Sequence, residues 1–150
     1  MPSSRRFIVL VPLCIAIIFL SASCAGTKSS QCKKMVEITR KIASETKTLS
    51  DNRKTLDPQK VLQVADAFEG TAKEMKSLAI QDKQLQEYQF GFAKMYLGMG
   101  QATRDFVAAL ARKDLSKAKL AKEQLQQLGI TERELVSQTN NYCLDNSIPR

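Results

Sequence analysis

Apolar side chains recur every three or four residues along most of the chain, which is the spacing of an amphipathic α-helix. A first helix is predicted over residues 30–50, with the stripe Cys32, Met35, Ile38, Ile42 and Leu49. A polar connection beginning at Asp51 leads to Asp57 and Pro58, which suit the cap and the first position of a second helix ending near residue 78. The inner face of this second helix reads Val61, Val64, Ala65, Phe68, Thr71, Met75 and Leu78.

The third predicted helix, over residues 82–112, has the most regular stripe, and Asp82 is its cap. The stripe consists of Leu85, Tyr88, Phe92, Met95, Met99, Ala102, Phe106 and Leu110. A fourth helix is predicted over residues 114–142, with the stripe Ala118, Ala121, Leu125, Leu128, Leu135, Thr139 and Cys143. Because this stripe keeps its phase across Gly129, we favour one helix, with a kink allowed there, over two helices.

The four helices and two cysteines predict one topology. Amphipathic helices joined by short connections most often form an up-down-up-down bundle. The sequence therefore predicts an all-α four-helix bundle over residues 30–143, after an N-terminal signal segment. In that topology Cys32 and Cys143 lie at the same end, so in an exported chain we expect them to form one disulfide.

The N-terminus has the three parts of a secretory signal. Arg5 and Arg6 precede the uncharged block of residues 7–20, and small residues follow it. We predict a signal peptide over residues 1–23, a short linker over residues 24–29 and a loose tail over residues 144–150. An uncleaved membrane anchor is the alternative, although the block is shorter than the roughly 20 apolar residues that span a bilayer.

The segment Leu20-Ser21-Ala22-Ser23-Cys24 resembles the lipobox of bacterial lipoproteins, in which the cysteine is acylated and becomes the new N-terminus. It departs from that pattern at Ser21, where leucine is usual. The resemblance implies a lipid on Cys24, a membrane tether and a periplasmic or cell-envelope location. The alternative is cleavage by ordinary signal peptidase, which gives a soluble secreted protein.

The whole plan of signal, early cysteine, four amphipathic helices and a closing Asn141-Tyr142-Cys143 resembles small helical-bundle lipoproteins of bacteria. It is more loosely similar to the lipid-anchored four-helix extrinsic subunit of the cyanobacterial photosystem, although the pair of body cysteines is outside that pattern. The resemblance implies a non-enzymatic, exported envelope lipoprotein that acts as a protein-binding or spacer module.

Histidine and tryptophan are absent, which excludes histidine-based metal ligation and general-base catalysis. Two body thiols alone make a weak metal site, so we expect no metal, no cofactor and no enzymatic activity. Glu132 falls on the inner stripe of the fourth predicted helix. There it either pairs with a basic side chain, lies in water near a bundle end, or acts as a perturbed acid.

Basic residues outnumber acidic ones by 23 to 15, and their excess lies in the first predicted helix, the first joint and the start of the fourth. In the predicted topology one end of the bundle, opposite the membrane, gathers Lys47, Arg53, Lys54, Lys60, Arg112, Lys113, Lys117, Lys119 and Lys122. We interpret this end as a docking site for an anionic protein, phospholipid headgroups or an anionic envelope polymer. The alternative is a solvated surface that maintains solubility. Nucleic acid is not expected as a partner, because the helix-borne lysines lack interleaved aromatic residues.

Gly91, Gly98 and Gly100 lie inside the third predicted helix, where each costs about 1 kcal/mol relative to alanine. Small residues there either let a neighbouring helix approach closely or leave a core pocket for a flat, apolar ligand. The side chains that would line such a pocket are Tyr88, Phe92, Met95, Tyr96 and Met99. A carrier of a small apolar ligand is therefore the alternative function.

Overall fold

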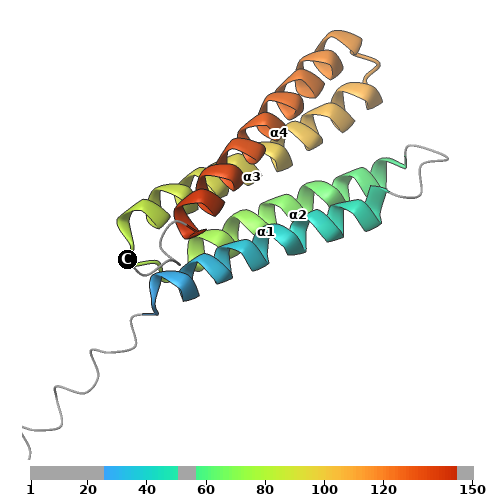
Figure 1. Ribbon diagram of the computed structural model, residues 1–150. Coiled ribbons are helices and arrows are strands. Elements are labelled where there is room, and N and C mark those ends of the chain that lie inside the picture. Colours follow the sequence, from blue (N-terminus) through green and yellow to red (C-terminus); the bar gives the residue numbers. More distant parts are fainter. Residues whose placement is uncertain (1–25, 51–56, 145–150) are drawn as a thin grey trace, which may run out of the picture.

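The computed structural model describes residues 26–50 and 57–144, with four α-helices and no strand in these ranges. The helices are α1 (Lys28–Ser50), α2 (Pro58–Ser77), α3 (Lys83–Ala111) and α4 (Leu115–Leu144). Successive helices run in opposite directions (Figure 1). The predicted all-α four-helix bundle is confirmed. The predicted signal peptide, Cys24, Arg53, Lys54 and residues 145–150 of the predicted tail lie outside the described residues.

Polar caps set where the helices begin. Asp57 accepts a hydrogen bond from the Gln59 amide at 2.9 Å, with Pro58 in the first turn, and Asp82 accepts one from the Leu85 amide at 2.9 Å. The first helix begins at Lys28, two residues before the predicted start and inside the predicted 24–29 linker. The reason is local, because the hydroxyl of Thr27 accepts a hydrogen bond from the Ser30 amide at 3.3 Å and so caps α1.

The fourth helix continues through Gly129 without a break, as the phase of its stripe predicts. The turn before it contains no glycine. Lys113 instead adopts the left-handed conformation with φ of 57°. Its amide donates to the Leu110 carbonyl at 3.0 Å, and the Asp114 amide donates to the Ala109 carbonyl at 2.9 Å. This pair of bonds is a Schellman motif, which ends α3 by satisfying two of its last carbonyls.

The large buried side chains lie between the disulfide end and the middle of the bundle. They include Met35, Ile42, Met75, Leu85, Phe92 and Tyr96. In the other half the buried residues are small, namely Ala65, Ala102, Thr103, Ala109, Ala118 and Ala121. Larger apolar residues there, such as Phe106 and Leu125, are only half-buried. The core is therefore closed at one end of the bundle and incomplete at the other.

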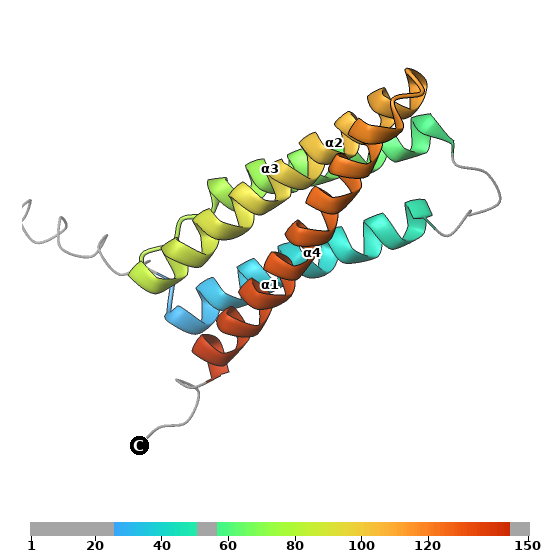
Figure 2. The ribbon, with the colours of Figure 1, turned by 90° about the horizontal axis from the view of Figure 1, so that it is seen from above.

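The arrangement of the helices explains this difference. The third helix packs along both α2 and α4, whereas α1 packs mainly on α2 and meets α4 only sparsely. Figures 1 and 2 show α1 and α4 diverging away from the disulfide end. Within the described ranges, no helix combines the length and hydropathy that crossing a bilayer requires.

Candidate functional site

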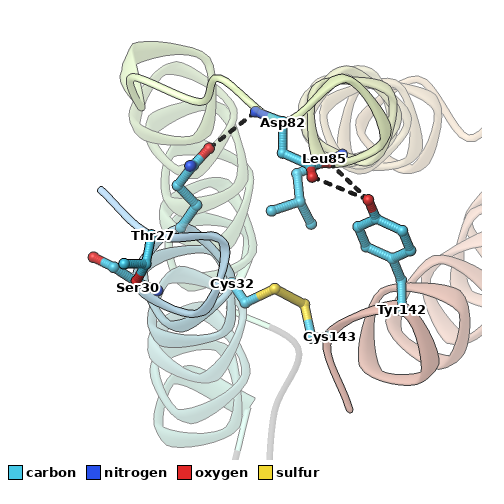
Figure 3. Close-up of a disulfide and its surroundings, with 8 residues drawn as sticks. Thr27, Ser30, Cys32, Asp82, Leu85, Tyr142 and Cys143 are labelled. Carbon is cyan, nitrogen blue, oxygen red and sulfur yellow. Dashed lines mark hydrogen bonds between the residues drawn. A yellow bond between two sulfur atoms is a disulfide. The ribbon is translucent and has the colours of Figure 1, made fainter. Parts of the chain in front are cut away.

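The disulfide joins the first turns of α1 to the last turn of α4 (Figure 3). Cys32 and Cys143 are bonded with their Cα atoms 6.0 Å apart. The predicted pairing is confirmed. Because α1 and α4 have few other contacts, this bond is the main link between the first and the last helix.

A polar cluster surrounds the disulfide and joins three helices. The Tyr142 hydroxyl on α4 donates to both carboxylate oxygens of Asp82, at 3.0 and 3.1 Å (Figure 3). The Leu85 amide and this hydroxyl lower the pKa of Asp82. Burial, and then the hydrogen bond to Asp82 and its charge, raise the pKa of Tyr142. Lys28 lies 3.2 Å from the centroid of the Tyr142 ring, so α1 also reaches the cluster through a cation–π contact.

Gln31 ties the turn between α2 and α3 to α1. This buried side chain donates to the Gly26 carbonyl at 2.6 Å and accepts from the amides of Gln81 and Asp82 at 2.7 and 3.2 Å. A buried amide with both ends bonded stabilises the structure, whereas an unbonded one would destabilise it. The disulfide end therefore has the character of a structural clamp.

Four of the five predicted pocket residues are buried in the core. They are Phe92, Met95, Tyr96 and Met99. Tyr88 is half-buried and packs edge-on against Tyr142. The rings of Phe92 and Phe68 flank the ring of Tyr96, with centroids 6.1 and 6.2 Å from its centroid. These side chains therefore pack against one another and do not enclose a cavity.

A hollow of about 130 Å³ lies between α1 and α4, and Met35, Phe92 and Val136 contribute to its lining. Sites for drug-sized ligands typically enclose about 300–1,000 Å³. Of the five predicted pocket residues, only Phe92 reaches this hollow. The geometry favours a packed core at these positions over a ligand site.

The glycines of α3 lie where neighbouring helices approach closely. A Cβ at Gly91 would lie 3.0 Å from Leu135 of α4, and one at Gly98 would lie 3.3 Å from Leu128. At Gly100 a Cβ would lie 2.7 Å from a Glu69 carbon on α2. These distances support the packing interpretation of the glycines.

Glu132 pairs with a tyrosine rather than with a basic residue. The buried Tyr96 hydroxyl donates to the Glu132 carboxylate at 3.2 Å, and Glu132 is half-buried. Burial, followed by the Glu132 charge, raises the pKa of Tyr96 beyond its usual range. A neutral tyrosine that donates to a carboxylate stabilises the helix pair. Among the described residues, no group of three or more acidic or cysteine side chains is placed to hold a metal ion.

One cluster of ion pairs, between α2 and α3, was not predicted from the sequence. Arg104 on α3 donates to Glu69 at 2.7 Å and also bonds Asp66, both on α2. The hydrogen bond from Arg104 lowers the pKa of Glu69. Asp66 and Glu69 are three residues apart, so the sequence places them on one face of α2. Their contact with Arg104 depends on the register of α2 against α3, which the sequence does not give. This cluster fixes that register at the surface.

The predicted basic residues occupy two separate places. Lys47 and Lys60 lie at the adjoining ends of α1 and α2. The others lie at the turn and along the start of α4, namely Arg112, Lys113, Lys117, Lys119 and Lys122. Figure 1 shows the α3–α4 turn standing apart from the ends of α1 and α2. The structure therefore brings the second group together and separates it from the first.

The end of the α3–α4 pair also exposes Leu115 and Leu120, which sequence analysis did not single out, and Leu110, which sequence analysis placed on an inner stripe. We call residues 110–122 the α3–α4 tip. Leu115 is 74% exposed, Leu120 is 62% exposed and Leu110 is 36% exposed. A hollow of about 260 Å³ on the tip is lined in part by Arg112, Lys117 and Leu120. Exposed apolar groups rimmed by charge are typical of interaction surfaces.

Comparison with known protein families, curated proteins and solved structures gives no match for this chain.

Proposed function

We propose that the chain is a non-enzymatic, exported envelope lipoprotein that binds a partner protein through its α3–α4 tip. The observation that carries this proposal is the coincidence of exposed leucines and clustered basic residues at the tip. Solubility alone accounts for lysines on a surface, but it does not account for Leu115 and Leu120 being largely exposed beside them.

The ends of the bundle support a tethered orientation. Gly26 lies at the disulfide end, two residues after Cys24, and the tip lies at the far end of α4. A 30-residue helix is about 45 Å long, so a lipid on Cys24 would hold the tip at about that distance from the membrane. This geometry suits a module that spaces a partner from the bilayer.

Two measurements test the proposal. Intact mass spectrometry of protein purified from membranes should show a lipid on Cys24, and Cys24→Ser should release the protein from the membrane fraction. Capture from envelope extract should yield a salt-sensitive partner that is lost in Lys113→Glu, Lys117→Glu, Lys119→Glu.

The matched control is Lys33→Glu, Lys73→Glu, Lys76→Glu, which makes the same charge change at exposed positions of α1 and α2. Equal capture by both triple variants would refute binding through the tip. An unmodified Cys24 in membrane-derived protein would refute the lipoprotein assignment.

A further inference from the structure

Within the part of the chain that the structure describes, an apolar surface remains uncovered inside the half of the bundle farther from the disulfide. We call it the open inner face. It comprises half-buried or exposed residues of α2 and α3, namely Val61, Val64, Phe106 and Leu110, and it is bordered by the half-buried Phe68 and Leu125, which also pack against the buried core. In a closed four-helix bundle the fourth neighbour would cover such positions. Here α1 and α4 diverge beside them (Figures 1 and 2).

Resting on the proposed function, we propose that the open inner face binds an acidic, amphipathic helix of the partner protein. The residues of this face follow helical spacing on their own elements, with Val61, Val64 and Phe68 on one side of α2. A helix that lays an apolar stripe into a groove between helices is a common recognition mode. The incoming helix would complete the core that α1 leaves incomplete.

The charge around this face selects an acidic occupant. Lys122 lies about five turns before Asn140, which lines the hollow between α1 and α4, so it lies on the same side of α4. Leu115 and Lys119 share that side by their spacing. Arg112 and Lys113 add positive charge at the adjoining turn.

Two of the acidic groups at this end, Asp57 and Asp114, are engaged in helix capping. They accept hydrogen bonds from the Gln59 and Lys117 amides at 2.9 and 3.0 Å. They therefore compensate helix N-termini rather than offering a negative surface. On α4, Lys117 pairs with Asp114 at 3.5 Å and Lys119 pairs with Glu123 at 3.9 Å, and both pairs are exposed and therefore weak. Among the described residues, Arg112, Lys113 and Lys122 have no ion pair, so they are the charges that meet an incoming chain.

A second copy of this chain and a lipid surface fit less well. Two copies would place the same basic side chains against each other, and like charges oppose such a contact. A bilayer needs one convex apolar surface. Leu115 and Leu120 lie on opposite flanks of α4 because five residues turn a helix by about 140°. The remaining apolar residues line the interior of the bundle.

The test uses the mature chain with Cys24→Ser and a synthetic peptide probe. The probe is a 20-residue amphipathic helix with leucines on one face and glutamates elsewhere, and its control is the same composition in scrambled order. We expect saturable one-to-one binding of the probe by calorimetry. In Lys119→Glu, Lys122→Glu we expect at least about tenfold weaker binding, and in Lys33→Glu, Lys34→Glu unchanged binding.

Amide chemical shifts locate the binding site in the same samples. Shifts concentrated at Phe68, Phe106 and Leu125 would support the proposal, and shifts confined to the outer face of α3 at Phe90 and Leu97 would overturn it. Phe106→Ala should weaken binding of the probe, while circular dichroism shows that the variant keeps its helical content.

Three further results would overturn the inference. They are equal binding of the scrambled peptide, equal binding by the Lys119→Glu, Lys122→Glu variant, and binding to phosphatidylglycerol vesicles with none to the probe. Failure of the proposed function is distinguishable, because it would appear as an unlipidated Cys24 or an absent envelope partner while the purified chain still binds the probe.

Discussion

Removing the disulfide should cost the protein a large part of its stability. The change is Cys32→Ala with Cys143→Ala, made in the chain with Cys24→Ser. The bonded cysteines are 111 residues apart in sequence. In the chain-entropy model a loop of about 100 residues contributes about 4.7 kcal/mol, by restricting the unfolded chain. Cys32 is also part of the core cluster, so loss of its sulfur packing adds to this figure.

The assay is urea unfolding followed by far-ultraviolet circular dichroism, with linear extrapolation to water. We expect the free energy of unfolding to fall by about 4–5 kcal/mol. The protein with both cysteines, measured in excess dithiothreitol, should lose somewhat less stability than the variant because it keeps the sulfur packing of Cys32, and the reductant should leave the variant unchanged. A loss under about 2 kcal/mol would refute the reasoning, since the bond would then not restrict the unfolded chain as its loop length requires.

Hydrogen exchange tests the structural part of the same prediction. The first helix meets α4 only sparsely apart from this bond, whereas α3 packs along two neighbours. Amides of α1 should therefore lose more protection than amides of α3 when the bond is removed. Uniform loss in all four helices would contradict the assigned role of the bond in holding α1.

Three other changes test the packing, the turn and the polar cluster. Gly100→Ala should lower the free energy of unfolding by about 1–3 kcal/mol, because its Cβ would lie 2.7 and 3.1 Å from atoms of α2. Gly129→Ala, whose added Cβ would meet nothing within 4 Å, should raise it by about 1 kcal/mol in the same urea unfolding assay. Lys113→Gly should raise the melting temperature because φ is 57° there, and Lys113→Ala, which removes the same charge, should not. Asp82 has a lowered folded pKa, so its stabilisation is present above its unfolded pKa of about 3.9 and is lost as pH falls through the folded value. Urea midpoints measured from pH 7 to 2.5 should show a shallower acid loss in Tyr142→Phe, and parallel profiles would contradict this account.

Local chemistry made the helices of this protein predictable from sequence. The stripe of Met35, Ile38 and Ile42 is buried as its spacing indicates. Asp57 and Asp82 cap helices because their carboxylates reach free amides of the first turn. The disulfide was predictable because the predicted topology places Cys32 and Cys143 at the same end of the bundle, where they can form a bond. These features depend on spacing along one helix or on the order of helices.

Features that depend on how helices cross were not predictable. The sequence groups Lys60 with Lys117 at one end, but it does not give the angle at which α1 departs from α4. Gly91 and Gly98 let α4 approach α3 closely, whereas the described part of α1 has no glycine that faces α4. The bonds of Arg104 to α2 depend likewise on register between helices, which apolar periodicity leaves open.

The sulfur–sulfur bond also determines which part of the chain would carry mechanical tension. A pull applied between Gly26 and the turn at Lys113 passes from Cys32 directly to Cys143 and along α4. The route through α1, α2 and α3 joins the same two points but contains more residues, so the shorter route through α4 sets the maximum extension. Each extended residue contributes at most about 3.6 Å. The route through the disulfide and α4 contains fewer than half as many residues as the route through α1, α2 and α3, so the fully extended oxidised chain reaches less than about half the length of the reduced chain. The disulfide would thus limit how far the bundle can be extended under load.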